Sequence, residues 1–253
     1  MPMGKMYKAS RPKSNSKSKN LEKKIQKAVA RGVTSYASIR TRSLIPKKSI
    51  IRFPYTALLT VPTLDATFTE NFNSFQFRVN DIFDPDQRAG LGEDNITATG
   101  FQHVFGTPGN NFQDGVYQNF TVLKNDISVT FVNESLEQGA IVGTYIQTIN
   151  GANLDYRTMT NQPQWYKERV LGVTDQSVAN ISYKLDLAKY VGSDVRDLRE
   201  YRGTQSSSPP NLIRLYVMTR NMNNTPEPNA IQVRVKMNYI VECTVPRDLE
   251  KGD

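Results

Sequence analysis

Apolar and polar residues alternate with a period of two along most of the chain from Pro54 onward, and this alternation predicts β-strands with one buried face. The pattern is clearest in SFQFRVN, where Phe75, Phe77 and Val79 point to one side and the residues between them to the other. We expect eight such strands, over residues 55–62, 74–80, 118–133, 138–148, 165–173, 181–187, 212–218 and 231–245.

Eight strands within about 200 residues, without helices alternating between them, predict an all-β fold built as an antiparallel sandwich or barrel. Two long connections, over 81–116 and 188–211, are rich in Gly, Asn, Ser and Pro. Loops of this length are uncommon unless they have a function, and in a sandwich they gather at its ends, where neighbouring molecules can meet.

The segment before these strands has a different composition. Residues 1–20 combine Lys, Arg, Ser, Pro and Asn with almost no apolar residues, so we expect them to be disordered in isolation. Asn20 can cap a short basic amphipathic helix that ends near Gly32. A solvated charge run and a calmodulin-like or membrane-surface amphipathic helix are alternatives, but basic residues continue on both sides, which favours a nucleic acid as its partner.

Charge divides the chain at the same place. Residues 1–52 contain 15 Lys/Arg and one acid, Glu22, whereas residues 53–253 contain 17 basic and 23 acidic residues. We therefore expect a basic nucleic-acid-binding arm over 1–52 and a folded domain over 53–253, the arm contacting phosphates without reading sequence. The expected phosphate-binding residues are Lys5, Lys8, Arg11, Lys13, Lys17, Lys19, Lys23, Lys24, Lys27, Arg31, Arg40, Arg42, Lys47 and Lys48.

The sequence lacks the residues that several classes of function require. The sequence has no apolar stretch of about 18 residues and no secretory h-region, so we expect no membrane insertion. His103 is the only histidine and Cys243 the only cysteine, which rules out clustered His/Cys metal sites and leaves a single candidate for any His-based triad. Glycine-rich phosphate-binding motifs are absent. We expect no enzyme activity and no cofactor, with His103 as a loop residue and Cys243 as a packed thiol.

Three acidic residues, Asp81, Asp84 and Asp86, lie close together in NDIFDPD. Carboxylates are the ligands that Ca²⁺ prefers, so a cation site between subunits is one interpretation. The spacing is not that of an EF-hand loop, and Asp-Pro-Asp is also a favourable turn sequence, which is the interpretation we prefer.

Aromatic and turn residues outside the core pattern are candidates for contacts. Tyr7 and Tyr36 lie within the arm and can stack on bases. Trp165, Tyr166 and the Pro209-Pro210 turn are candidate contacts between copies of the chain, although Trp165 fits a place in the core equally well.

Four stretches carry a resemblance to a known family: FQFRVNDIFDPD (75–86), YQNFTVLKNDISVTFVN (117–133), KLDLAKYVGSD (184–194) and VRVKMNYIVECTVPRDLEKGD (233–253). In this order, and after a basic arm, they resemble the single jelly-roll capsid proteins of circular Rep-encoding single-stranded DNA (CRESS-DNA) viruses. More distantly, the chain is similar to satellite-virus and tombusvirus-like shell domains. The resemblance implies an eight-stranded jelly roll.

The resemblance also implies a function: copies of the chain form an icosahedral shell, and the arm points inward and neutralises a single-stranded DNA genome. It places the protein in the virion and, during assembly, in the host nucleus, with a nuclear import receptor as a further partner. The arm is richer in Lys and Ser than the Arg-dense arms of some circoviruses. The alternatives are the capsid of a small single-stranded RNA or satellite virus, and a non-viral jelly-roll binding module with a nucleic-acid-binding tail.

Overall fold

The computed structural model describes residues 45–61, 73–86, 97–135, 138–148, 161, 164–173, 176–221 and 231–246. The chain divides into two compact units, Met1–Ile45 and Pro46–Asp253, and all the described elements lie in the second. Its strands are β1 (Lys48–Val61), β2 (Asn73–Arg78), β3 (Tyr117–Asn133), β4 (Ala140–Gln147), β5 (Tyr166–Leu171), β6 (Val178–Asp186), β7 (Arg202–Thr204), β8 (Arg214–Asn221) and β9 (Ile231–Pro246). The short helices are α2 (Phe101–Phe105), η1 (Pro108–Asn110), α4 (Leu187–Val191) and η2 (Arg199–Tyr201).

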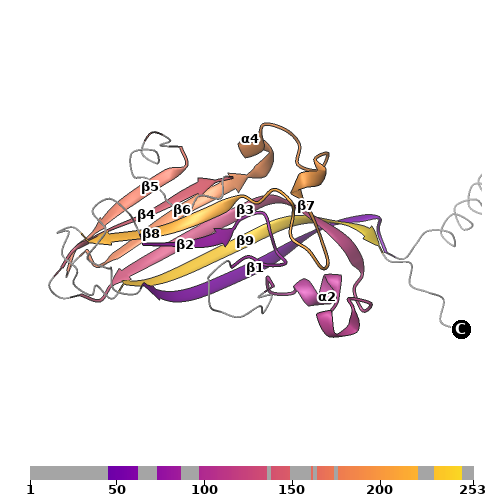
Figure 1. The fold of residues 1–253 in the computed structure, drawn as a ribbon, viewed down its shortest axis with the longest axis horizontal. Coiled ribbons are helices and arrows are strands. Elements are labelled where there is room, and N and C mark those ends of the chain that lie inside the picture. Colours follow the sequence, from indigo (N-terminus) through magenta and orange to yellow (C-terminus); the bar gives the residue numbers. More distant parts are fainter. Residues whose placement is uncertain are drawn as a thin grey trace, which may run out of the picture. The chain divides into compact units, whose positions relative to one another are not determined.

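These strands form two antiparallel sheets that pack face to face (Figure 1). One sheet has the order β1-β9-β3-β6, with the short β7 also paired to β3, and the other has the order β2-β8-β4-β5. First and last strands therefore pair with each other, and each sheet alternates strands from distant parts of the chain. This order is that of a jelly roll, which confirms the predicted fold class.

Every second residue along the strands points into the core between the two sheets. In β1, Phe53, Tyr55, Ala57 and Leu59 are buried while the residues between them are exposed, and the odd-numbered positions of β9 from 231 to 243 are also buried. The hydroxyl groups of Thr144 in β4 and Tyr183 in β6 lie 2.8 Å apart in this core and link one sheet to the other.

The first strand starts earlier than the sequence predicts. Alternation is weak before Pro54, yet β1 begins at Lys48, which pairs with Thr244 of β9. The 16-residue β9 offers backbone partners along its whole length, so strand pairing continues where the side-chain pattern has faded. Lys48 to Arg52, which we assigned to the arm, are consequently strand residues.

The long connections hold short elements that the sequence did not reveal. In the first, α2 places Phe101 and Phe105 in an aromatic cluster, with ring centroids 4.7 Å apart, and Phe53 lies 6.0 Å from Phe105. The second contains α4, η2 and β7. Both connections are therefore built into the domain at these points.

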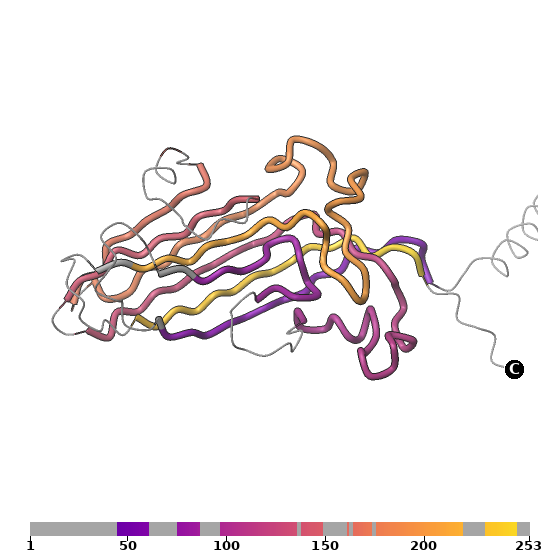
Figure 2. Tube along the Cα trace, viewed as in Figure 1, coloured from indigo at the N-terminus to yellow at the C-terminus, as the bar shows by residue number. Residues whose placement is uncertain are grey.

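A β-bulge lies between Val122 and Lys124 of β3 and divides this strand between two partners. Before the bulge, Asn119–Thr121 pair with β7, and after it Lys124–Val132 pair with β6. Figure 2 shows the chain leaving β6 through α4 and returning beside the start of β3 as β7. The bulge residue, Leu123, lies where the two partners separate.

The predicted helix over 20–32 lies outside the described residues. Among the residues that are described, no helix is long and apolar enough to cross a membrane.

Candidate nucleic-acid interface

Most of the predicted phosphate-binding residues, from Lys5 to Arg42, lie outside the described part of the chain, as do Tyr7 and Tyr36. Lys47 and Lys48 lie inside it, and both are exposed. The Nζ atom of Lys48 is 3.2 Å from Oε1 of Glu242, whose side chain is only 9% exposed. Lys48 therefore forms an ion pair with a carboxylate of the domain, whereas Lys47 precedes the first strand.

Further cations, which we did not predict as binding residues, lie on the outward face of the β1-β9-β3-β6 sheet. The strand registers place five exposed side chains on this face: Arg52, Lys124, Lys184, Arg234 and Lys236. Alternation within each strand already indicates that these residues point away from the core. Their gathering on one face depends on the sheet order, which local patterns do not reveal.

The acidic cluster is organised by one arginine. Nη1 of Arg78, at the end of β2, lies 3.3 Å from Oδ2 of Asp81 and 2.5 Å from Oδ2 of Asp84, and it donates to the hydroxyl oxygen of Ser208 at 3.1 Å. Asp86 accepts a hydrogen bond of 2.7 Å from the Tyr55 hydroxyl. The first two carboxylates thus neutralise a guanidinium group, and the third belongs to a separate contact.

Backbone contacts fix the turn around this cluster. The Phe83 amide donates to Oδ1 of Asp81 at 3.0 Å, and Asn80 donates from Nδ2 to the Asn211 carbonyl and accepts from the Ile213 amide, both at 2.8 Å. Burial raises the pKa of Asp81 to about 6, although the Ser208 hydrogen bond and the Arg78 charge lower it. Burial also raises the pKa of Asp84. Within the described ranges, no three His, Cys, Asp or Glu residues form a group that could hold a metal ion.

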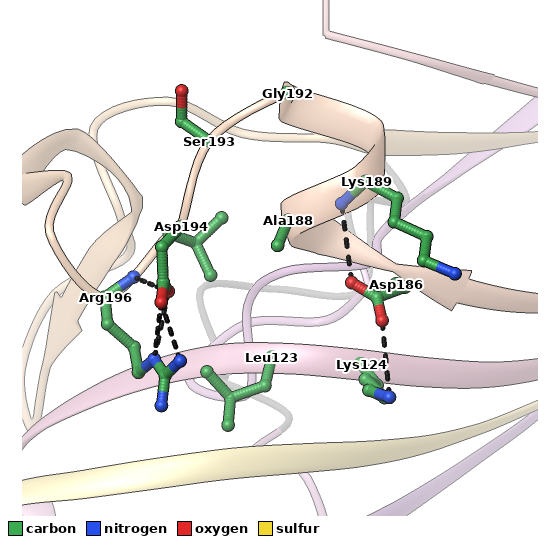
Figure 3. Close-up of a pocket in the computed structure, with 10 residues that line it drawn as sticks. Leu123, Lys124, Asp186, Ala188, Lys189, Gly192, Ser193, Asp194 and Arg196 are labelled. Atoms are coloured by element: carbon green, nitrogen blue, oxygen red, sulfur yellow. Dashed lines mark hydrogen bonds and ion pairs between the residues drawn. The ribbon is translucent and has the colours of Figure 1, made fainter.

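A pocket of about 450 Å³ lies at one end of the basic face, where β6 leaves the sheet. Two ion pairs line it, Lys124 with Asp186 at 3.3 Å and Arg196 with Asp194 at 2.6 Å, and Leu123 lies between them (Figure 3). The hydrogen bonds from Arg196 lower the pKa of Asp194 to about 2. Because each of these carboxylates has a cation beside it, the pocket offers a balanced charge rather than an anion site.

Within the described residues, neither His103 nor Cys243 belongs to a group of three His, Cys, Asp or Glu side chains that could hold a metal ion. His103 is exposed in the last turn of α2. Cys243 is fully buried in β9, and burial followed by the nearby charge of Glu242 raises the pKa of its thiol to about 12. A thiol with this pKa carries almost no thiolate, the nucleophilic form, at neutral pH.

The candidate contact residues differ in their accessibility. Trp165 is half-buried, with its ring 4.6 Å from that of Tyr190, and it packs on a buried cluster that includes Tyr166. The Tyr166 hydroxyl donates to Oε2 of Glu168 at 2.6 Å. Pro210 is exposed, whereas Pro209 is buried. Tyr166 and Pro209 are thus interior residues of the domain rather than surface contacts.

Comparison with known proteins gives only distant similarities. No family model matches the chain, and no curated protein matches it. Among solved structures, Desmodium yellow mottle tymovirus is 11% identical, with 84% of this chain and 99% of that chain covered and a TM-score of 0.38. A semi-empty virus-like particle of giant freshwater prawn (Macrobrachium rosenbergii) nodavirus is 12% identical, with 82% and 98% covered and a TM-score of 0.45.

A decameric BFDV capsid protein is 7% identical, with 78% of this chain and 99% of that chain covered and a TM-score of 0.40. These similar structures are of a virus, a virus-like particle and a capsid protein. At these identities and scores, the similarity adds nothing to what the strand order shows: the described domain of this chain is a single jelly roll.

Proposed function

We propose that this chain is a viral capsid protein whose copies assemble into a small icosahedral shell and package a single-stranded genome through the basic segment before β1. The observation that carries the proposal is the division of charge between the two parts of the chain. Fifteen Lys/Arg and a single acid precede Phe53, whereas the remainder has six more acidic than basic residues. A jelly roll of negative net charge is thereby joined to a strongly basic segment, which can bind polyanions.

In one shell, many basic segments bind the same nucleic acid, which strengthens the total binding. Each arm contributes a modest, salt-sensitive affinity, but arms held together by a shell act on one nucleic acid at a high effective concentration. Charge alone then explains retention of a genome, without a sequence-specific site in the domain.

Exposed apolar side chains at the sheet edges support self-association. Leu58 and Ile50 of β1 are 73% and 65% exposed, Val178 of β6 is 60% exposed, and Val170 of β5 is 56% exposed. These three strands are the outer strands of their sheets. Copies that meet along these edges bury apolar surface that a single chain leaves in water.

We further propose a single-stranded DNA genome and a CRESS-DNA virus as the source, together with passage of the protein through the host nucleus. The support is the resemblance of the four sequence stretches, since phosphate contacts do not distinguish DNA from RNA. DNase and RNase digestion of the nucleic acid from particles of natural origin tests this part separately.

The experiment that tests packaging compares the wild-type chain with a full-length variant in which the twelve basic residues from Lys5 to Arg42 listed above are replaced by Gln. Negative-stain microscopy reports assembly, and the ratio of absorbance at 260 and 280 nm reports nucleic acid. We expect isometric particles from both chains, with nucleic acid only in the wild type. A small discrete oligomer from the wild-type chain, with or without nucleic acid, would instead favour the non-viral binding module.

A further inference from the structure

One face of the jelly roll exposes polar and basic side chains on its two central strands, β9 and β3, and its exposed apolar residues Ile50, Leu58 and Val178 lie on the edge strands β1 and β6. On the β1-β9-β3-β6 sheet, the register aligns Thr56, Lys236, Ser128 and Ser182 in one row across the four strands. The next row is Leu58, Arg234, Thr130 and Asn180. All eight side chains occupy outward-facing positions, and none of these eight residues is buried.

At its centre, the outward face of the β2-β8-β4-β5 sheet holds a buried, largely aromatic cluster instead of exposed charges. Its central positions hold Tyr145, Tyr166, Tyr216 and Met218, which form a cluster with at most 8% of any member exposed. A ligand that approaches the domain cannot reach these side chains. The two sheets therefore present unlike outer surfaces, and only the first displays charge at its centre.

Three carboxylates lie on the strands of the basic face: Glu242 and Asp186 toward one end, and Asp126 in the row beside that of Lys236. Glu242 pairs with Lys48, Asp186 pairs with Lys124, and Asp126 lies opposite Lys184 in the register. Arg234 and Lys236, in contrast, have only hydroxyl and aliphatic residues directly opposite them on both adjacent strands, and Asp126 is diagonal to Lys236. Neither of them has an ion pair with any residue of the described ranges.

This excess of positive charge runs against the composition of the domain. Residues 48–253 contain 19 basic and 23 acidic residues, yet the outward face of the four strands carries six Lys/Arg against three acids. A fourth acid, Glu134, lies just beyond the end of β3 and accepts a hydrogen bond from Gln232. Its first cations, Lys48 and Arg52, lie in the strand that directly follows the basic segment. Arg52 shares a row with Ile240 and Lys124, so positive charge continues from the start of β1 across the sheet.

We infer that Arg234 and Lys236 bind phosphate groups of the packaged single-stranded nucleic acid, and that this face of the jelly roll is turned toward the genome. The inference rests on the proposed function and adds a second nucleic-acid contact to that of the arm. Cations without an ion-pair partner can neutralise phosphates, which releases the counterions condensed on the nucleic acid. The hydroxyl and amide groups around them can donate further hydrogen bonds to phosphate oxygens. No aromatic residue occupies the two rows, so contact is through charge and not through base stacking.

The test is the salt dependence of binding to a fluorescently labelled single-stranded 20-mer, measured with the full chain. Each phosphate contact on a single strand contributes about 0.7 to the slope of log K against log salt concentration. We expect R234Q/K236Q to flatten this slope by about 1.4. The matched control R169Q/R199Q, which removes two exposed charges outside this face, is expected to keep the wild-type slope. A wild-type slope for R234Q/K236Q would overturn the inference.

A second measurement needs no substitution on the face. We expect acetylation of Lys236 to be slower in wild-type particles, which hold nucleic acid, than in empty particles of the arm-neutralised variant. Equal rates would overturn the inference even if R234Q/K236Q failed to fold, and R234K/K236R, which keeps both charges, is expected to retain the wild-type slope. Wild-type protein that forms no particles and holds no nucleic acid would contradict the proposed function itself, which separates the two failures.

Discussion

Gly203 of β7 lies directly against the ring of Phe120 in β3, its partner in the register. A Cβ atom on Gly203 would overlap the Cζ, Cε1 and Cε2 atoms of that ring. Phe120 is fully buried and its ring centroid lies 5.8 Å from that of Phe105. The ring cannot retreat, so β7 pairs with β3 only because position 203 has no side chain.

We therefore expect Gly203→Ala to lower the free energy of unfolding by about 1–3 kcal/mol, the usual cost of overpacking a filled core. Denaturant unfolding of the unassembled protein measures this change. Gly109→Ala is the control, because a Cβ at Gly109 meets no atom within 4 Å. Equal unfolding midpoints for the two variants would contradict the packing argument.

The hydrogen bond between Tyr183 and Thr144 is expected to stabilise the packing of the two sheets. Removing the hydroxyl in Tyr183→Phe leaves a buried polar group at Thr144 without this partner, which costs about 1–3 kcal/mol. A double-mutant cycle with Thr144→Val tests the pairing, since the two changes should be less than additive. Additive losses would show that the two hydroxyl groups do not act together.

The raised pKa of Asp81 predicts a specific dependence of stability on pH. Because the pKa is about 6 in the folded chain and 3.8 as the ordinary value, folding favours the protonated form. This contribution is fully present below pH 3.8 and is lost as the pH rises through 6, by about 3 kcal/mol at most. Asp81→Asn cannot titrate, so its stability relative to the wild type should increase between pH 4 and pH 7.

Unfolding free energies at pH 4.5, 6 and 7.5 measure this difference for Asp81→Asn. The exposed Asp197→Asn provides the control for a general change in charge. A constant difference between Asp81→Asn and the wild type across this range would show that Asp81 does not titrate near pH 6.

Cys243 should resist thiol reagents as long as the domain is folded. Its side chain is fully buried, and its pKa of about 12 leaves almost no thiolate at pH 8. We expect labelling with an aromatic disulfide reagent to follow global unfolding, and hence to accelerate with denaturant. Fast labelling in native buffer would require an opening of β9 that the described fold does not contain.

Local sequence patterns predicted the strands whose side chains alternate clearly between core and surface. The predicted strand over 118–133 corresponds to β3 at 117–133, because its side chains alternate between core and surface for most of its length. The start of β1 and the whole of β7 were missed, because both depend on distant partners, β9 and β3. Pairing with a remote strand leaves no periodic trace in a short segment.

For the candidate site too, local patterns indicated residue types and directions, but not the contacts between side chains. NDIFDPD was interpreted as a turn or a cation site from its residue types, but the sequence did not indicate that Arg78 would lie between Asp81 and Asp84. Arg234 and Lys236 could be assigned an outward direction from alternation in β9. Their neutral neighbours, Ser128 and Thr130, come from a strand about a hundred residues away, and only the three-dimensional register brings them together.

The bulge at Leu123 has a consequence for how copies of this chain avoid uncontrolled aggregation. An unbroken edge strand is a template on which another chain can add its own strand, and repetition of that step produces fibres. Here the bulge divides one edge of the sheet between β6 and the three-residue β7, and Pro54 removes an amide donor from β1 at the opposite edge. In the shell that we propose, association would thereby be directed to side-chain surfaces of fixed geometry instead of open-ended backbone pairing.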